Sequence, residues 1–100
     1  MRRGDVWTAV RLGHERKVVI VGNDVLNDRH EGVLAVPLSD VHEPDLVMPS
    51  VHDSEGKPLG TFLTHRVGQV SKAYLTSRAA VLDQASQESV DIALRAALDL

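Results

Sequence analysis

The sequence contains no cysteine among its 100 residues. The chain therefore cannot form a disulfide, and it offers neither a thiolate nucleophile nor the cysteine ligands of a zinc site. Histidine occurs five times, but none of the pairs has a spacing such as His-x-x-x-His that would indicate a metal ligand set. We expect no metal and no cofactor. Besides His14, which is expected in the loop between the first two predicted strands, the histidines are His30, His42, His52 and His65.

Long apolar runs are also missing, and no segment approaches the roughly 20 residues that span a membrane. No apolar signal segment follows the basic start of the chain, so we expect a cytoplasmic protein without membrane attachment. The hydrophobic content of 43% is ordinary for a globular protein. A chain of 100 residues without a linker is expected to form a single domain over residues 1–100.

Acidic residues outnumber basic ones, and the net charge of −3 is unusual for a protein that binds nucleic acid. The charges are unevenly distributed, however. Residues 61–78 carry three basic residues and no acidic one, whereas residues 37–60 carry one basic residue and five acidic ones. The basic segments are 2–29 and 65–78. This distribution is compatible with one basic face.

Most of the chain has a β-strand pattern. Val6–Leu12 alternates between apolar and other side chains, and Val18–Val21 is a β-branched run that indicates a central strand. Further strands are expected over Val33–Leu38, Leu46–Val51, Thr61–Val70, with a bend at Gly68, and Ala79–Leu82. The connections expected between them are a polar loop over Asn23–Glu31, a turn over Asp53–Gly60 and a single helical turn over Lys72–Leu75.

The end of the chain changes period. From Gln84 to Leu98, apolar residues recur at helical spacing, and Asp83 is a suitable N-cap because its carboxylate can accept from the unpaired first N–H groups. Several strands followed by one helix predict a mainly β fold, a compact sheet or barrel with a C-terminal α-helix packed on it.

Three motifs resemble those of the MazF/PemK/Kid toxin family. Members of that family open with Arg-Gly-Asp, an aliphatic residue and an aromatic one, and this chain has Gly4-Asp5-Val6-Trp7. Their second strand begins Arg-Pro-Val, to which Arg16-Lys17-Val18 corresponds, and their third strand ends in Pro-(Leu/Ile)-Thr, to which Pro37-Leu38-Ser39 corresponds. The last 29 residues follow the family pattern without a gap, so the resemblance spans essentially the whole chain.

The resemblance implies an SH3-like small β-barrel of the MazF/CcdB type, a homodimer and sequence-specific cleavage of single-stranded RNA. It also implies a partner, an acidic and partly disordered antitoxin that competes with RNA. The catalytic pair of the family is the Arg before the Pro of strand two and the Thr after the Pro-Leu of strand three. These positions are Arg16 and Ser39 in this chain.

Such an enzyme needs no protein nucleophile and no metal, because the 2′-hydroxyl of RNA can attack the neighbouring phosphorus. The guanidinium of Arg16 would stabilise charge on the phosphoryl oxygens, and the Ser39 hydroxyl would donate to the phosphate. His14, Lys17, Arg66 and Trp7 are further candidates for RNA contacts. Trp7 also fits a core or dimer-interface position, and His14 and Arg16 also fit ordinary solvated positions.

Two departures from the family pattern affect the predicted site. The loop between the first two strands is reduced to a few residues around Gly13, and Lys17 replaces the Pro that stiffens the Arg turn. Two other functions therefore stay open. One is a non-catalytic CcdB-like toxin that binds DNA gyrase, although the Gly4-Asp5-Val6-Trp7 opening is that of the ribonucleases. The other is a degenerate dimeric domain that only binds a partner.

Overall fold

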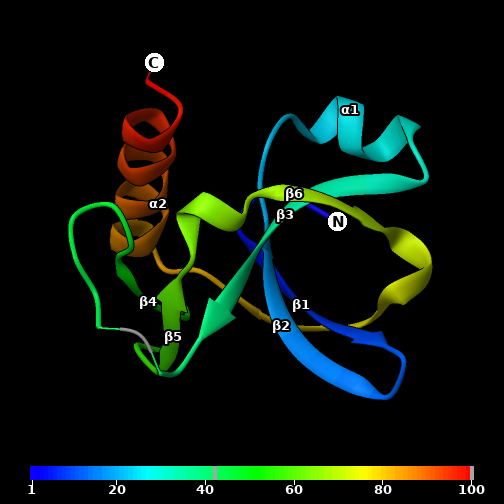
Figure 1. Cartoon of the computed structure of the whole chain (residues 1–100), viewed down its shortest axis with the longest axis horizontal. Helices are drawn as coiled ribbons and strands as arrows, with labels where there is room; N and C mark the ends of the chain where they lie inside the picture. Colours follow the sequence, from blue (N-terminus) through cyan, green and yellow to red (C-terminus); the bar gives the residue numbers. More distant parts are fainter. Residues whose placement is uncertain (42, 100) are drawn as a thin grey trace.

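The computed structural model describes residues 1–41 and 43–99 (Figure 1). Its strands, helices and 3₁₀ turns follow one another as β1 (Asp5–Arg11), β2 (His14–Ile20), α1 (Asp24–Arg29), β3 (Gly32–Ser39), β4 (Ser50–His52), β5 (Pro58–Phe62), η1 (Thr64–Arg66), β6 (Gly68–Ser71), η2 (Lys72–Tyr74), β7 (Leu75–Val81) and α2 (Gln84–Ala97).

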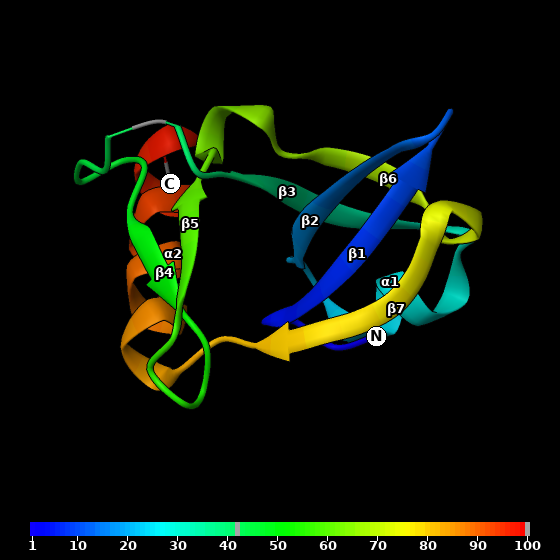
Figure 2. The same cartoon turned by 90° about the horizontal axis from the view of Figure 1, so that it is seen from below.

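The strands form one strongly curled antiparallel sheet in the order β4-β5-β3-β2-β1-β7, and β6 pairs with β3 beyond the end of β5. The views in Figures 1 and 2 show the β1–β2 hairpin at one end of the molecule and α2 beside β4 at the other. A bridge between Asp53 and Leu82 joins the two ends of the sheet. The mainly β fold with a C-terminal helix that the sequence predicts is therefore confirmed.

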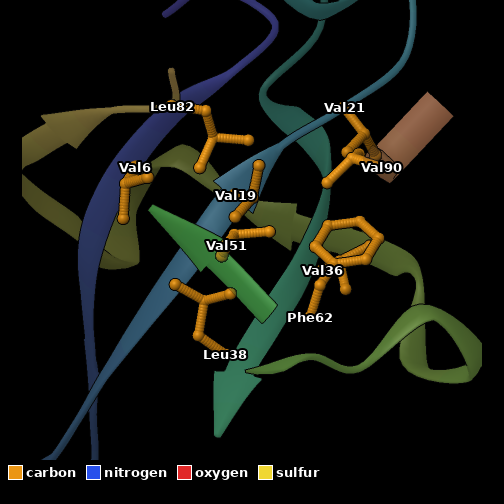
Figure 3. Packing of buried hydrophobic residues seen from close by; sticks show 9 residues of the cluster. All are labelled: Val6, Val19, Val21, Val36, Leu38, Val51, Phe62, Leu82 and Val90. Carbon is orange, nitrogen blue, oxygen red and sulfur yellow. The ribbon is translucent and has the colours of Figure 1, made fainter. Parts of the chain in front are cut away.

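Aliphatic side chains on the two faces of β2 and β3 form two separate cores. The larger core lies beneath α2 and includes Val19, Val36, Phe62 and Val90, as Figure 3 shows. The second core consists of Val18, Ile20, Val33, Ala35 and Leu75. Because β2 and β3 contribute alternate residues to both cores, they are buried on two faces, which explains their β-branched composition.

The Gly4-Asp5 pair of the opening motif forms a tight closure of the fold. Gly4 has a φ of +92°, donates to the carbonyl of Ile20 at 2.9 Å and accepts from the N–H of Leu82 at 3.0 Å. A Cβ at this position would lie only 1.7 Å from the side-chain nitrogen of Gln87 on α2. The motif therefore ties the start of β1 to β2 and to the end of β7, and its positive φ favours glycine, although the flexible end of the Gln87 side chain could move.

The region predicted as a polar loop over Asn23–Glu31 contains α1 instead, so that prediction is wrong. Asn23 caps the helix, because its side-chain oxygen accepts from the N–H groups of Val25 and Leu26. The buried amide of Asn27 donates to the carbonyl of Val21 and accepts from Leu34. These tertiary hydrogen bonds stabilise a helix that is too short to persist alone.

Two predicted strands also differ from the structure. In the segment Leu46–Val51, only the last two residues belong to β4, because the Asp45 carboxylate accepts from Val47 and Met48 and holds the preceding residues in a turn. The segment Thr61–Val70 is not continuous. It ends β5 at Phe62, turns through η1 and resumes as β6 at Gly68.

The predicted helix over Gln84–Leu98 is confirmed as α2, which ends one residue earlier, and the Asp83 N-cap is confirmed as well. The Asp83 carboxylate accepts from the N–H of Ser86 at 2.7 Å. The Ser86 hydroxyl accepts in turn from the N–H of His52 at 2.8 Å, which joins the helix start to β4. The helical turn expected at Lys72–Leu75 is η2, and β7 begins four residues before the strand predicted at Ala79.

A two-residue turn, Leu12-Gly13, joins β1 and β2. Both residues have positive φ, +52° and +80°, as a type I′ hairpin turn requires. Glycine adopts this conformation freely, but a leucine is strained there. The Leu12 side chain is 89% exposed, so packing does not offset this strain.

Replacing Leu12 with Asn should raise the free energy of unfolding by about 1 kcal/mol, because Asn tolerates the left-handed conformation and favours type I′ turns. Urea denaturation would measure the change. The matched control is Leu46→Asn, since Leu46 is 92% exposed and has no positive φ. Equal effects of the two substitutions would contradict the strain at Leu12.

The hydrogen bonds from Ser86, with a smaller effect of His52, hold the pKa of Asp83 below its usual 3.8. A carboxyl group whose pKa is lowered by folding stabilises the folded state above its unfolded pKa, and this contribution is lost as the pH falls through the folded-state pKa. The stability advantage of the wild type over Asp83→Asn, which keeps a capping oxygen, should therefore be larger at pH 7 than at pH 3. Urea denaturation across this range would test it, and a difference independent of pH would contradict it.

Candidate active site

The two predicted catalytic residues are placed by the register of β2 against β3. Val18 lies opposite Pro37, and this is the last pair of the β2–β3 ladder. Arg16 and Ser39 each lie two residues beyond that pair. Because side chains alternate along a strand, both leave the same face of the sheet as Val18 and Pro37.

Beyond the last pair, the two strands turn to different partners. Arg16 pairs with Ala9 of β1, whereas Ser39 pairs with Thr61 of β5. The two residues therefore flank the point at which the β1–β2 hairpin diverges from the β3–β5 pair. Arg16 is exposed and Ser39 is partly buried, and the Ser39 hydroxyl accepts from the N–H of Val41 at 3.2 Å.

A hollow of about 650 Å³ lies between the β1–β2 hairpin and the β6–η2 segment. Arg16 and His14 line it together with Arg11, Leu12, Tyr74 and the apolar side chains of Ala9, Val18 and Val70. Glu15 is its only acidic lining residue in the described part of the chain. Cationic groups thus surround an apolar floor. The other lining residues are Gln69 and Ser71 of β6.

The structure separates the four candidate RNA-binding residues. His14 was expected in a loop but is the first residue of β2, where it pairs with Arg11 beside Arg16. Lys17 leaves the opposite face of β2 from Arg16, because the two are neighbours in a strand. Arg66 is exposed on η1, which packs against α2 and β3 rather than against the hairpin. Of these four residues, only His14 lines the hollow together with Arg16.

Trp7 packs partly buried against the second core, on the same face as Val18. In the part of the chain that the structure describes, its indole Nε1 is the buried side-chain polar atom without a hydrogen-bond partner. A buried N–H without an acceptor is unfavourable, so this ring contributes packing at the cost of one unpaired donor. The ring supports the sheet beneath the hollow.

Arg11 and Tyr74 are site residues that sequence reasoning missed. The Arg11 guanidinium lies over the Tyr74 ring, 5.4 Å from its centroid, which is the geometry of a cation–π contact. One feature of the sequence could have drawn attention to Tyr74: it is the one tyrosine among few aromatic residues. Nothing in the local pattern indicates that η2 brings Tyr74 against the end of β1.

Over residues 1–41 and 43–99, no group of three His, Asp or Glu side chains is placed so that it could hold a metal ion. His42 lies outside the described residues. None of the helices in the same part of the chain is long and apolar enough to cross a membrane.

Several solved structures share this fold. One is an endoribonuclease from a mycobacterial species in complex with its cognate antitoxin, with 21% identity and a TM-score of 0.88 over 100% of this chain and 96% of that one. The MazE–MazF complex from Deinococcus radiodurans is 13% identical, with a TM-score of 0.84 over 100% and 96% of the two chains. The Mycobacterium tuberculosis toxin MazF-mt6 is 16% identical, with a TM-score of 0.79 over 96% and 97%.

At these identities the likeness establishes the fold, which is that of the MazF-type toxins. The family itself follows from the sequence. The chain belongs to the PemK-like, MazF-like toxins of type II toxin–antitoxin systems, whose family model matches residues 2–98. No curated protein matches the sequence. The family resemblance and the MazF-like fold predicted from the motifs are confirmed, whereas the roles of Arg16, Ser39, His14, Lys17, Arg66 and Trp7 stay predictions.

Proposed function

We propose that the chain, as one toxin unit over residues 1–100, is a metal-independent endoribonuclease that cleaves single-stranded RNA in the cytoplasm. The observation that carries the proposal is the placement of Arg16 and Ser39 on one face, at the divergence of the β1–β2 and β3–β5 pairs, with the guanidinium exposed. Membership of the MazF-like toxins and a fold shared with endoribonucleases support it.

The chemistry requires little of the protein because RNA carries its own nucleophile. The 2′-hydroxyl oxygen forms a bond to the adjacent phosphorus and loses its proton, while the bond from phosphorus to the 5′-oxygen breaks and that oxygen gains a proton. The products are a 2′,3′-cyclic phosphate and a free 5′-hydroxyl. The protein must hold the 2′-hydroxyl in line with the leaving oxygen and stabilise the added charge on the phosphoryl oxygens.

Arg16 is assigned to the charge that develops on the phosphate. A guanidinium carries a positive charge, and its fork of N–H groups matches two phosphoryl oxygens. Ser39 is assigned to a second hydrogen bond to the same phosphate, with its hydroxyl donating. The hydroxyl accepts from the N–H of Val41 at 3.2 Å, which helps to fix the position of the oxygen.

Two partners belong to this proposal. The first is a second copy of the chain, because β7 ends the strand order and exposes most of its residues. The second is a cognate antitoxin whose acidic, partly disordered segment would cover the cationic hollow and compete with RNA. Of the structures that share the fold, the mycobacterial endoribonuclease is in complex with its cognate antitoxin, and the one from Deinococcus radiodurans is a MazE–MazF complex.

Arg16→Ala should lower the rate of RNA cleavage by about 100-fold or more, the usual effect of removing one donor to the developing charge. Cleavage of single-stranded RNA in the presence of EDTA, followed by primer extension, would measure it. Arg95→Ala is the matched control, since it also removes one exposed arginine but lies on α2. Undiminished cleavage by folded Arg16→Ala would refute the assignment.

Ser39→Ala should slow cleavage in the same assay by about 10- to 100-fold, whereas Ser39→Thr should retain most of the rate because it keeps the hydroxyl. Circular dichroism would establish that both variants are folded. If the Ala and Thr variants were equally slow, the hydroxyl would not be the active group. If the wild type failed to cut RNA and instead inhibited DNA supercoiling by gyrase, the proposed activity would be wrong.

A further inference from the structure

The hollow beside Arg16 is larger than a single phosphate contact requires. Its volume of about 650 Å³ lies within the range of small-molecule sites, roughly 300–1,000 Å³. Its floor is formed by Ala9, Val18 and Val70, which carry no side-chain polar groups. A flat and largely apolar group of a ligand would therefore be desolvated there at little cost, with charged parts of the same ligand outside.

One wall of the hollow is an aromatic ring held in place by a guanidinium. Tyr74 is 38% exposed, so part of its ring is open to a ligand. Arg11 lies 5.4 Å from the ring centroid and limits the motion of both side chains. Aromatic rings and arginine planes are the surfaces on which unpaired RNA bases stack.

The lip of the hollow is formed by Leu12, the strained residue of the hairpin turn. The side chain is 89% exposed and holds the left-handed conformation without compensation from packing. Local strain of this kind that the core does not explain points to a role in binding. An apolar side chain at this lip would shield one side of a bound ring from water.

The edge of β6 supplies polar groups to the hollow. The backbone N–H of Lys72 donates to the carbonyl of Glu31 at 2.8 Å. This pair continues the β3–β6 ladder, in which Val70 lies opposite Val33. Hydrogen bonds alternate along an antiparallel pair, so the backbone groups of Gln69 and Ser71 point away from β3. Both residues line the hollow. Backbone N–H and C=O groups there can bind the edge of a base.

We propose that this hollow binds one unstacked base of the RNA strand, next to the phosphate held by Arg16, and thereby sets the base preference at that position. The base would stack on the Tyr74–Arg11 pair, with Leu12 covering its edge. The inference rests on the proposed ribonuclease function and goes further, because it assigns specificity to residues outside the catalytic pair.

The first experiment compares base preference among variants. The wild type, Tyr74→Ala and Tyr74→Phe would each cut a single-stranded RNA pool of random sequence, and the fragment ends would be sequenced. We expect Tyr74→Ala to lower the preference at one position near the cut by about tenfold or more, as loss of a base–aromatic stack does. Tyr74→Phe should keep the preference, because the ring remains.

The second experiment locates the base by its removal. A preferred oligonucleotide with a 2′-deoxy sugar at the cut, which cannot be cleaved, would carry an abasic site at each position in turn. At the position that occupies the hollow, base removal should weaken binding to the wild type about tenfold but should not weaken binding to Tyr74→Ala any further. If base removal weakened both proteins equally at every position, the proposal would be overturned.

The two proposals fail in different ways. Suppose that the wild type did not cut RNA, while removing the base at one position still weakened binding to the wild type and not to Tyr74→Ala. In that case the base-binding site would be supported and the nuclease assignment would be wrong. If Arg16→Ala abolished cleavage but Tyr74→Ala left both base preference and binding unchanged, the nuclease assignment would stand and the base site would fall. Leu12→Asn, which is expected to be more stable, is a second probe, since it should weaken binding without unfolding the protein.

Discussion

The antiparallel register of β2 against β3 is the constraint on which the rest of the site depends. Only three residue pairs join the two strands, and both strands are buried on two faces by separate cores. Shifting the register by one residue would exchange those faces, so packing of both cores fixes it. The same register places Arg16 and Ser39 on one face, although no strand pairing connects them directly. The positions of the polar groups thus follow from the packing of Val18, Val19, Val36 and their neighbours.

The family motifs have different physical roles in the structure. Gly4 is fixed by its positive φ and by the side chain of Gln87, so the opening motif closes the fold and does not itself belong to the chemistry. Arg16, in contrast, is exposed on β2, and Ser39 lies partly buried at the end of β3. The net charge of −3 does not prevent a locally basic surface, because two arginines, Arg11 and Arg16, line the hollow against one acidic residue, Glu15.

Sequence reasoning found the features that local patterns determine. The hairpin, the buried third strand and α2 with its Asp83 cap follow from alternation, β-branching and helical spacing. It missed α1, whose six residues depend on the tertiary hydrogen bonds of Asn27, and it joined β5 to β6 because the pattern does not show the turn at Thr64–Arg66. The proposed catalytic pair, Arg16 and Ser39, came from family motifs. Tyr74 could not be found in this way, since only the tertiary path through η2 brings it to Arg11.

The shortness of the β1–β2 turn has a thermodynamic consequence. This hairpin ends in two residues, Leu12 and Gly13, whose dihedral angles are already set. A preorganised rim loses little conformational entropy when a ligand enters, so less of the interaction energy is spent on ordering the protein. The same stiffness prevents the rim from reshaping itself around different ligands. Such a protein would gain discrimination through fixed shape and would tolerate fewer kinds of RNA and antitoxin segments than one with a mobile loop.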